Sequence, residues 1–348
     1  MVEDQIMSIS VKTYTDLPDH AGVVDQVLEL LDDVREHDGV EAFSEAFVRG
    51  IRQDRGHEHA VAFEGDQVVG VVGIDPDRVV EIAVLPSRRH NGVATKLFDA
   101  MARDLGITGC IDVWAHGDGA GAQRFVETLD ARRCRELLKM AVKCAPGSER
   151  AQSFTKGDED ARKKAEEQGI EVLTYTESVE RFGEEATDEE WVRVNNEAFA
   201  WHPEQGGLSI EQLHEARDTK WFDPDGVWML WQFDENCSYE RVGIQVDGGE
   251  YRCVGFHWTK IPVSERAKDA GERAGEVYVV CLADEARGRK LGGAITLIGM
   301  GSLLRDGAGV IELYVEGDNA PAVATYKRLG FEVVHTDVVY RGQLGVQH

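Results

Sequence analysis

The chain has 348 residues, a length that usually needs two hydrophobic cores, and 42% of its residues are hydrophobic. Its 64 Asp and Glu residues against 38 Lys and Arg give a formal charge of −26, which disfavours nucleic acid and anionic membranes as partners. No apolar run approaches the roughly 18 residues of a membrane helix, and the N-terminus lacks the order of a signal peptide. We therefore predict a cytoplasmic protein of two domains.

The acidic residues are spread along the chain, which is typical of the solvated acidic surface of a salt-adapted protein. The six cysteines lie far apart, with no CxxC pair and no metal-ligand spacing, so we predict free, mostly buried thiols and no metal site. A catalytic cysteine is the lesser alternative. These cysteines are Cys110, Cys134, Cys144, Cys237, Cys253 and Cys281.

Two segments share one order of expected elements, offset by roughly 200 residues. In the first, the strands QVVGVVGI and VVEIAVL lead through a polar turn into a helical pattern, VATKLFDAMARDLG. In the second, the strands CVGFHWTKI and EVYVVCL precede the turn ADEARGRKLGG and the helix AITLIGMGSLL. The second copy continues with a strand, VIELYV, a helix, APAVATYKRLG, and a last strand, FEVVHTDVVY. This repetition predicts a duplicated α/β fold.

Two stretches interrupt this pattern. Residues 146–168 are charged and have almost no large apolar side chains, which predicts a charged, partly helical linker between domains at 1–145 and 169–348. Residues 199–226 combine aromatic residues with His-Pro, Gly-Gly and Asp-Pro pairs that one continuous helix cannot contain. We predict that this second stretch is an irregular lid that faces the substrate.

The turn of the first copy has the features of a diphosphate site. The run Arg89-His90-Asn91-Gly92-Val93-Ala94 starts five residues after the expected strand end at Val84 and opens a helix. A diphosphate needs several backbone N–H donors at a helix N-terminus, where the helix dipole favours negative charge. Gly92 lets the backbone approach the ligand, and Arg89 adds a charged donor. A helix start with incidental basic residues is the alternative.

The second copy carries a similar run, Arg287-Gly288-Arg289-Lys290-Leu291-Gly292, five residues after Leu282. Lys290 stands where the first copy has Gly92, and a lysine adopts positive φ less readily than glycine. Gly293, directly behind Gly292, can restore the close approach. Both runs resemble the pyrophosphate loop, Arg/Gln-x-x-Gly-x-Gly/Ala, of GNAT acetyltransferases, and the resemblance implies acetyl-CoA as the co-substrate.

The end of the second copy, Asn319-x-x-Ala322-x-x-x-Tyr326-x-x-x-Gly330-Phe331, resembles the last helix–strand motif of GNAT enzymes. There the tyrosine faces the thioester sulfur, and a phenol with a pKa of roughly 10 can protonate a departing CoA thiolate. A tyrosine packed under the final strand is the alternative. The first copy has Val126 at the corresponding place, so we predict that the first domain binds CoA or packs structurally without catalysis.

Over nearly its whole length the chain resembles the mycothiol synthases, which are tandem GNAT enzymes that acetylate the cysteinyl amine of a cysteinyl-glucosaminyl-inositol. The resemblance implies an α/β (α+β) fold class with two tandem GNAT folds, each a mixed, splayed central sheet flanked by helices. The runs that carry it are WAHG (114–117), REL (135–137), RVNN (193–196), AFA (198–200), HPEQGG (202–207), WFDPDG (221–226), GFHWTK (255–260), GEVYV (275–279) and LYVE (313–316).

The resemblance also implies roles for single residues. Glu276 matches the general base and Tyr326 the general acid. Substrate contacts are implied at Glu204, Lys260 and Tyr314, and more weakly at Glu45. Cofactor contacts are implied in the second copy at Val280, Cys281, Leu282, Arg287, Gly288, Arg289, Lys290, Leu291, Gly292, Gly293, Asn319 and Ala322, and in the first copy at Ile82, Ala83, Val84, Arg89, His90, Asn91, Gly92, Val93, Ala94 and Thr95.

The expected chemistry is direct transfer to a small-molecule amine in a monomeric enzyme. An amine arrives mostly as an ammonium, so a carboxylate such as Glu276 must accept a proton. The alternatives are that Glu276 is an exposed residue at the start of a strand, that Lys260 is a solvated lysine, and that Glu204 caps a helix. Another aminothiol as acceptor, acetylation of a protein N-terminus or lysine, and a non-catalytic CoA-binding regulator also remain open.

Overall fold

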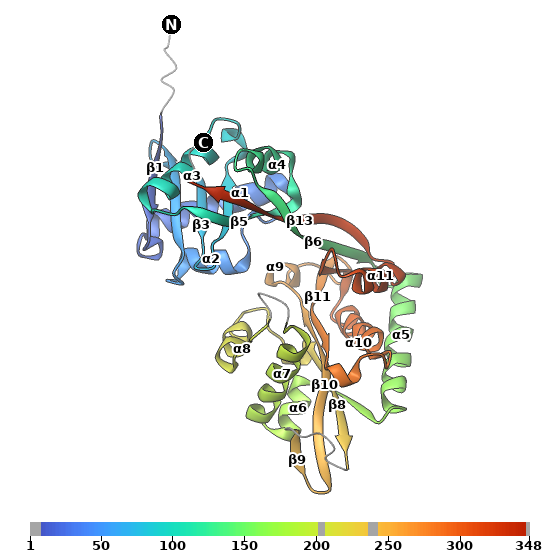
Figure 1. Ribbon diagram of the computed structural model, residues 1–348. Coiled ribbons are helices and arrows are strands. Elements are labelled where there is room, and N and C mark those ends of the chain that lie inside the picture. Colours follow the sequence, from blue (N-terminus) through green and yellow to red (C-terminus); the bar gives the residue numbers. More distant parts are fainter. Residues whose placement is uncertain (1–7, 201–205, 236–242, 346–348) are drawn as a thin grey trace. The chain divides into compact units, whose positions relative to one another are not determined.

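A computed structural model describes residues 8–200, 206–235 and 243–345, and the chain forms two compact units (Figure 1). Unit 1 comprises Met1–Leu138, Glu316–Asn319 and His335–His348. Unit 2 comprises Lys139–Val315 and Ala320–Val334. Within the described residues, no helix is both long and apolar enough to cross a membrane.

Each copy repeats one order of elements, and short 3-10 helices are marked η. The elements that begin in unit 1 are β1 (Ile9–Tyr14), η1 (Leu17–Asp19), α1 (Ala21–Asp38), α2 (Glu45–Arg52), β2 (Glu58–Glu64), β3 (Gln67–Ile74), β4 (Val79–Val84), η2 (Pro86–Arg88), α3 (Val93–Asp104), β5 (Gly109–Ala115), η3 (His116–Asp118), α4 (Ala120–Glu127) and β6 (Arg132–Lys143). The elements that begin in unit 2 are α5 (Glu149–Glu166), β7 (Ile170–Thr174), α6 (Tyr175–Phe182), α7 (Glu184–Ala198), α8 (Ile210–Arg217), η4 (Pro224–Gly226), β8 (Val227–Asp234), β9 (Ile244–Val246), β10 (Gly249–Lys260), α9 (Val263–Arg266), β11 (Arg273–Leu282), η5 (Asp284–Ala286), α10 (Leu291–Arg305), β12 (Ala308–Glu316), α11 (Ala320–Arg328) and β13 (Glu332–Leu344).

The two units build the same kind of mixed sheet. In unit 1, β1, β2, β3 and β4 are antiparallel neighbours, and β4 then pairs with β5 in parallel. In unit 2, β7, β8, β10 and β11 are antiparallel neighbours, and β11 pairs with β12 in parallel. The predicted duplication and the mixed sheet flanked by helices in each copy are therefore confirmed.

The last strand of each copy passes into the other unit. From His335 onward β13 belongs to unit 1, where Val338 to Leu344 pair antiparallel with Ala115 to Gly109 of β5. β6 enters unit 2 at Lys139 and is the neighbour of β12 there. The two units therefore differ from the predicted domains at 1–145 and 169–348. Pairing between segments so far apart leaves no local pattern in the sequence from which the exchange could be inferred.

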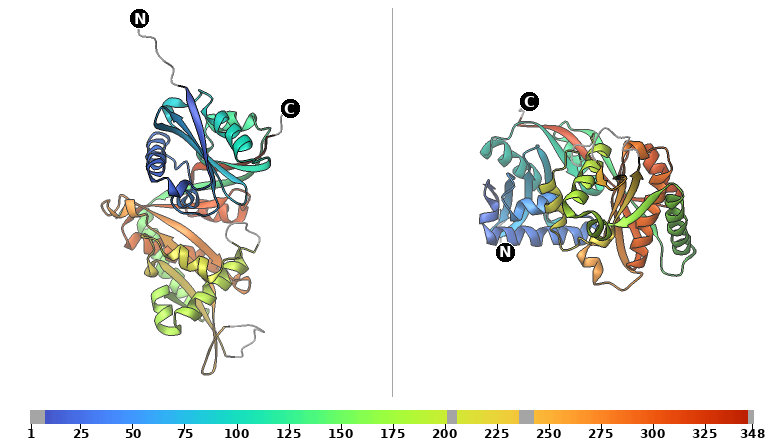
Figure 2. Two further views of the ribbon diagram at one scale, coloured as in Figure 1. Left: turned by 90° about the vertical axis from the view of Figure 1, so that its left-hand side faces the viewer. Right: turned by 90° about the horizontal axis from the view of Figure 1, so that it is seen from below.

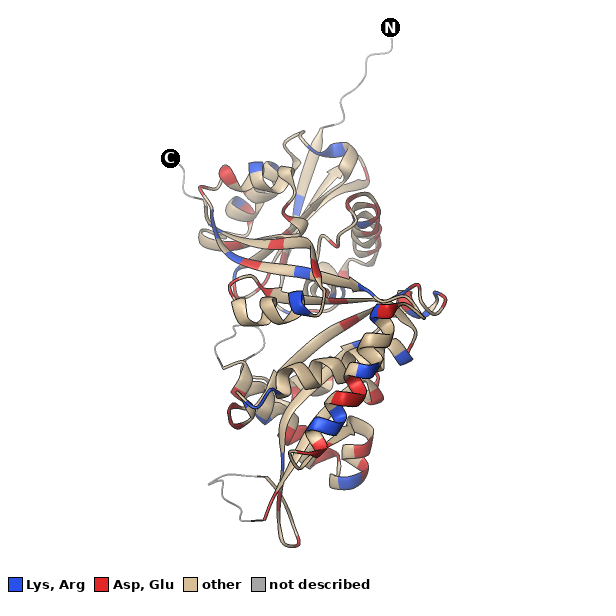
Figure 3. Cartoon of the chain, turned by 90° about the vertical axis from the view of Figure 1, so that its right-hand side faces the viewer, with Lys and Arg blue, Asp and Glu red and all other residues tan. Residues whose placement is uncertain are grey.

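The segment predicted as a charged, partly helical linker forms helix α5, which packs against α10 (Figures 1 and 2). Its buried residues recur at spacings of three and four, which is the period of an amphipathic helix. They escaped recognition because most of them are alanines and one is an aspartate. These residues are Ala151, Phe154, Asp158, Ala161 and Ala165. Figure 3 shows that acidic and basic residues occur along the chain in both units.

The predicted lid contains a regular element, because residues after 209 form helix α8. Ser209 and Gln212 make a capping box, in which each side chain bonds the backbone N–H of the other residue. The spacing Ser-x-x-Gln was visible in the sequence and could have predicted this helix start. Residues 201–205 lie outside the described residues, and the substrate-facing role of the segment stays a prediction.

Helices cover both faces of the unit 2 sheet. Phe256 on β10 packs against Trp191 of α7, with ring centroids 5.5 Å apart. Leu230 of β8 and Val254 of β10 lie in a cluster with Ile295 of α10. On β8 the faces alternate residue by residue, since Met229 and Trp231 lie in the cluster with Trp191 and Leu230 lies in the other. Val254 and Phe256 of β10 are two residues apart yet face opposite sides, because the register of β10 with β8 shifts between Cys253 and Gly255.

Glycines let α10 approach its neighbours closely. A Cβ added at Gly301 would lie 2.4 Å from Oδ2 of Asp158 and 2.7 Å from its Cβ. Asp158 cannot easily move, because it is buried and ion-paired to Arg162 (2.8 Å) and Arg305 (2.5 Å). The close contact between α5 and α10 therefore requires glycine at position 301.

We expect Gly301→Ala to lower the free energy of unfolding by about 1–3 kcal/mol, because the new methyl overpacks the contact with Asp158. The matched control is Gly293→Ala in the same helix, where an added Cβ meets nothing within 4 Å. That change should be stabilising by up to about 1 kcal/mol through helix propensity. Urea unfolding of both variants measures the difference, and equal stabilisation by both substitutions would contradict the packing described.

Candidate active site

The parallel strand pair of each unit separates before its strands end. In unit 2 the register of β11 and β12 runs to Val277 opposite Leu313, although β11 continues to Leu282. In unit 1 the register of β4 and β5 runs to Val80 opposite Val113, and β4 continues to Val84. Beyond the separation, one backbone edge of β11 and of β4 turns away from its parallel neighbour.

The predicted cofactor residues of the strands lie on these separated ends. Val280 and Leu282 remain paired with His257 and Gly255 of β10, so their strand is held on its other edge. Ile82, Ala83 and Val84 pair with β3 in the same way. A backbone edge of this kind can donate N–H groups to an extended amide-containing ligand. The structure thus brings the predicted strand contacts and the turns that follow them together in each unit.

The two turns share one backbone conformation. In the first, His90 has φ 62° and Gly92 has φ 73°; in the second, Gly288 has φ 79° and Lys290 has φ 63°. Gly92 and Lys290 each occupy the N-cap position, before α3 and α10 respectively. Lys290 therefore adopts the left-handed conformation, although a lysine adopts positive φ less readily than the glycine of the first turn. Each turn places one glycine and one other residue at its two positive-φ positions. Each turn therefore holds one non-glycine residue in the unfavourable left-handed conformation.

The arginines of the two turns differ in their contacts. Arg89 makes two hydrogen bonds to Asp38 at the end of α1, at 2.8 and 2.6 Å, and the bond to Arg89 lowers the pKa of Asp38. Arg287 pairs with Asp284 at 2.9 Å, with both side chains more than half exposed. Such an exposed pair is weak, so Arg287 is easier to redirect to a phosphate than Arg89. Arg289 donates to Gln232 at 2.7 Å.

Glu276 lies on β11 one residue before the strands separate, and its register partner on β10 is Lys260. Nζ of Lys260 is 3.8 Å from Oε2 of Glu276. The same Nζ lies 4.8 Å from the ring centroid of Trp221 and 5.0 Å from that of Tyr278. Lys260 is 9% exposed, so the solvated role left open for it is wrong.

Tyr326 lies on α11, which follows β12, and its ring packs 5.7 Å from that of Phe331. Gly330 ends the helix with φ 88°, and the Phe331 N–H donates to the Tyr326 carbonyl at 3.0 Å. Gly330 and Phe331 thus form the C-cap of α11. Their place in the sequence motif is explained by this cap and needs no role in catalysis. Burial raises the pKa of Tyr326, so its phenol stays protonated near neutral pH.

The remaining predicted residues are distributed between the units. Tyr314 is 41% exposed on β12 of unit 2, and Ala322 lies on α11. Asn319 directly precedes α11 but belongs to unit 1, and Glu45 is the first residue of α2. Glu204 lies outside the described residues.

The first copy cannot supply a tyrosine at the position of Tyr326. Val126 on α4 is 3% exposed and packs in the hydrophobic core of unit 1. Buried cysteines are equally poor candidates for catalysis: burial raises the pKa of Cys144 to about 11 and that of Cys253 to about 12. A thiol with so high a pKa carries little thiolate near neutral pH.

A buried ionic cluster in unit 1 was not foreseen from the sequence. Nε2 of His116 is 3.3 Å from Oε1 of Glu81, and Nδ1 is 3.5 Å from Oδ2 of Asp337. Glu81 accepts the Ser44 N–H at 2.7 Å, and Asp337 accepts the Gly117 N–H at 2.7 Å. Burial by itself lowers the pKa of His116, but the bonds and charges of Asp337 and Glu81 raise it to about 10. His116 belongs to the WAHG run, yet nothing in the sequence links it to Asp337 on the distant strand β13.

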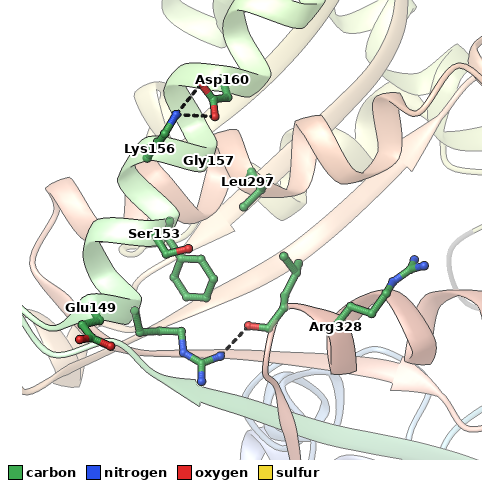
Figure 4. Close-up of a pocket in the computed structure, with 10 residues that line it drawn as sticks. Glu149, Ser153, Lys156, Gly157, Asp160, Leu297 and Arg328 are labelled. Carbon is green, nitrogen blue, oxygen red and sulfur yellow. Dashed lines mark hydrogen bonds and ion pairs between the residues drawn. The ribbon is translucent and has the colours of Figure 1, made fainter.

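A surface pocket of about 530 Å³ lies in unit 2 beside α5 and extends to Arg328 and Leu329 at the end of α11 (Figure 4). Lys156 and Asp160 form an ion pair on its wall, and Arg150 donates to the Leu329 carbonyl at 3.0 Å. None of the residues predicted to bind cofactor or substrate lines it, so it is not the candidate site. Its lining residues are Glu149, Arg150, Ser153, Phe154, Lys156, Gly157, Asp160, Leu297, Arg328 and Leu329.

Comparison with known families agrees with this duplicated architecture. The model of the acetyltransferase (GNAT) family matches residues 24–130 and 208–331, one segment in each copy. The chain belongs to the GNAT family of acetyltransferases. It is a tandem, mycothiol synthase-like member of that family and an acyltransferase, as the sequence predicted.

The chain resembles curated relatives along its whole length. A protein named mycothiol acetyltransferase from Corynebacterium jeikeium (strain K411) is 64% identical over 345 residues, covering 97% of this chain and 100% of that protein. One of the same name from Corynebacterium urealyticum (strain ATCC 43042 / DSM 7109) is 55% identical, covering 97% and 100%.

Solved structures share the fold at low sequence identity. A tandem GNAT protein from the clavulanic acid biosynthesis pathway has a TM-score of 0.61 at 16% identity and covers 98% of this chain and 100% of that one. A GCN5-related N-acetyltransferase from Sphaerobacter thermophilus has a TM-score of 0.59 at 20% identity and covers 96% and 95%.

The His116 cluster predicts a specific pH dependence of stability. The folded pKa of His116, about 10, lies above its unfolded value of 6.5, so its stabilisation is complete below pH 6.5 and is lost as the pH rises towards 10. At pH 7, His116→Gln should cost about 3–5 kcal/mol, because two buried carboxylates lose their cation. Urea unfolding should show this cost shrinking between pH 7 and 10. The exposed His20→Gln serves as control, and a pH-independent cost for His116→Gln would refute the charged assignment.

Proposed function

We propose that this enzyme transfers the acetyl group of acetyl-CoA to the cysteinyl amine of a cysteinyl-glucosaminyl-inositol, the acceptor of the mycothiol synthases. The names and full-length similarity of the corynebacterial relatives support this acceptor. The observation that carries the chemistry is the position of Glu276, one residue before β11 and β12 separate and on the strand that leads into the turn before α10.

The second turn has the properties that a CoA diphosphate requires. Gly288 and Lys290 hold the left-handed conformation, and α10 begins directly after Lys290, so its first backbone N–H groups are available at a helix N-terminus. An added Cβ at Gly288 or Gly293 would meet nothing within 4 Å, which leaves open space for a ligand. We infer that residues 287–293 hold the diphosphate and that Val280 to Leu282 hydrogen-bond the pantetheine. Bound acetyl-CoA supplies the reactive thioester.

In the proposed reaction, the acceptor nitrogen forms a bond to the acetyl carbon, and the bond from that carbon to the CoA sulfur breaks. Glu276 accepts the proton that the amine loses. Tyr326 gives its proton to the departing thiolate, a role that its raised pKa supports. Backbone N–H groups of the separated β11 edge would stabilise the developing oxyanion. Tyr314 and Glu204, both in unit 2, are the proposed acceptor contacts.

We propose that unit 1 does not catalyse. Its turn has the same left-handed backbone, so it retains the geometry for binding acetyl-CoA through Ile82 to Val84 and His90 to Thr95. However, Arg89 is committed to Asp38, and Val126 occupies the place of the acid. Acetyl-CoA in unit 1 would therefore be a structural ligand.

The division of labour is tested by Glu276→Gln and Gly92→Val. Glu276→Gln keeps the shape of the side chain but cannot take a proton, so acetyl transfer at pH 7 should fall by about 10²–10⁴-fold. The defect should shrink as the pH rises, because the amine then arrives deprotonated. Gly92→Val strains only the turn of unit 1 and should leave most of the activity if the protein stays folded.

The measurement is a pH–rate profile of CoA thiol release, with circular dichroism to confirm folding. Cysteinyl-glucosaminyl-inositol, cysteine and a lysine-containing peptide serve as parallel acceptors. A folded but inactive Gly92→Val beside a normal Glu276→Gln would mean that the catalytic unit is assigned wrongly. Preference for the peptide would favour a protein acetyltransferase instead.

A further inference from the structure

Four charged side chains cross the sheet of unit 2 immediately before β11 and β12 separate. Lys260 on β10 is the register partner of Glu276 on β11, and Glu276 is the register partner of Glu312 on β12. Oε2 of Glu312 lies 2.9 Å from Nζ of Lys139 on β6. The order across the four strands is therefore lysine, glutamate, glutamate, lysine.

This order places two carboxylates, Glu276 and Glu312, on neighbouring strands, which is unfavourable for a base that must be ionised. Carboxylates on directly paired residues of adjacent strands repel each other, and the repulsion favours protonation of one of them. Lys139 offsets the charge of Glu312 at 2.9 Å, and Lys260 stands in the corresponding place beside Glu276 at 3.8 Å. Glu265, on the neighbouring helix α9, is already bonded to Lys268 at 2.7 Å and to the Ala274 N–H at 2.8 Å.

The ammonium of Lys260 is fixed by aromatic rings. Trp221, Trp258 and Tyr278 contact one another, with centroid distances of 5.4, 5.0 and 5.1 Å, and Nζ faces two of these rings. Cation–π attraction holds a largely buried ammonium in place and in its charged form. We call Trp221, Trp258 and Tyr278 the aromatic cage.

The backbone around the cage is anchored as well. Arg266 donates to the Trp221 carbonyl at 2.7 Å, and Oγ1 of Thr259 donates to the Gly226 carbonyl at 2.8 Å. The register of β10 and β11 shifts between Trp258 and Thr259, which leaves Tyr278 as an extra residue on β11. The sequence runs 221–226, 255–260 and 275–279, three of those that carry the resemblance to the mycothiol synthases, therefore meet around one lysine.

We propose that Lys260 is a positioning residue for Glu276: held in the aromatic cage, it keeps the base ionised and oriented beside the second carboxylate, Glu312. This inference rests on the proposed role of Glu276 and replaces the implied acceptor contact at Lys260 with an action through the base. Tyr278 and Trp221 act through Lys260, because they fix where its charge lies.

Lys260→Met tests the proposal with two readouts. Without the nearby cation, the titration midpoint of the Glu276 carboxyl should rise by about one pH unit or more. The midpoint is followed by the carbon-13 resonance of glutamate-labelled protein, assigned by its loss in Glu276→Gln. At pH 7 the carboxyl stays ionised after such a rise, so there the loss of its fixed orientation should lower kcat at least about tenfold. The KM for cysteinyl-glucosaminyl-inositol should change less than about threefold. Lys260→Arg should retain most of kcat.

Lys156→Met is the matched control, because it removes the same charge from an exposed pair on α5 and should change neither readout. If Lys260→Met does not fold, Trp221→Leu opens the cage and should raise the midpoint by a smaller amount. A raised acceptor KM with unchanged kcat and midpoint would overturn the proposal in favour of a direct substrate contact. Absence of acetyl transfer in the unaltered protein would instead refute the proposed function, and the Glu276 titration would still decide the charge effect.

Discussion

The candidate site depends on one backbone constraint: the parallel partner of β11 ends its pairing at Val277, while the antiparallel partner continues to Leu282. Hydrogen bonding to β10 holds β11 on one side from Glu276 up to Leu282. On the other side, the edge that leaves β12 can meet an extended ligand without any strand being broken. The turn before α10 follows directly, so one short segment of chain can contact both the acyl end and the diphosphate end of a cofactor.

The same constraint explains where the charges of the site lie. Glu276 is the last residue but one that pairs with β12 before the separation. Its register partners are therefore Lys260 on β10 and Glu312 on β12. Unit 1 has the same strand separation and the same turn conformation, but there Glu81 and Asp337 accept the backbone N–H groups of Ser44 and Gly117, and both pair with His116. Ionic groups thus lie near the strand separation in both units. In unit 2 a lysine pairs with the proposed base, whereas in unit 1 a histidine pairs with two carboxylates that bind backbone N–H groups.

Much of this arrangement was predictable from sequence, because it is local. The strand ends at Val84 and Leu282 and the start of α3 at Val93 are set by apolar strands, polar turns and helical periodicity, and the structure has them where they were predicted. Helix α10 begins three residues earlier than predicted, at Leu291 instead of Ala294. The left-handed conformation of Lys290 was harder to predict, because the residue type alone does not determine whether the surrounding turn will hold it at positive φ. α5 was missed because its buried stripe consists mainly of alanines and Asp158, which hydropathy does not separate from a linker.

The contacts between distant segments could not be predicted. The passage of β13 into unit 1 brings Asp337 to His116, and no pattern in either run indicates the other. The aromatic cage is an intermediate case: its three runs were among those that carry the resemblance to the mycothiol synthases, but their meeting around Lys260 follows only from the register of β10 and β11 and the position of Trp221.

The central claim, that the separated end of β11 and the turn before α10 form the acetyl-CoA site of the catalytic unit, can be tested most directly by hydrogen exchange with mass spectrometry. The backbone N–H groups of residues 278–293 should exchange more slowly when acetyl-CoA is added, because bound cofactor would accept hydrogen bonds from them. This protection is expected whether or not residues 82–95 of unit 1 are also protected. Protection confined to unit 1, or to the surface pocket beside α5, would contradict it.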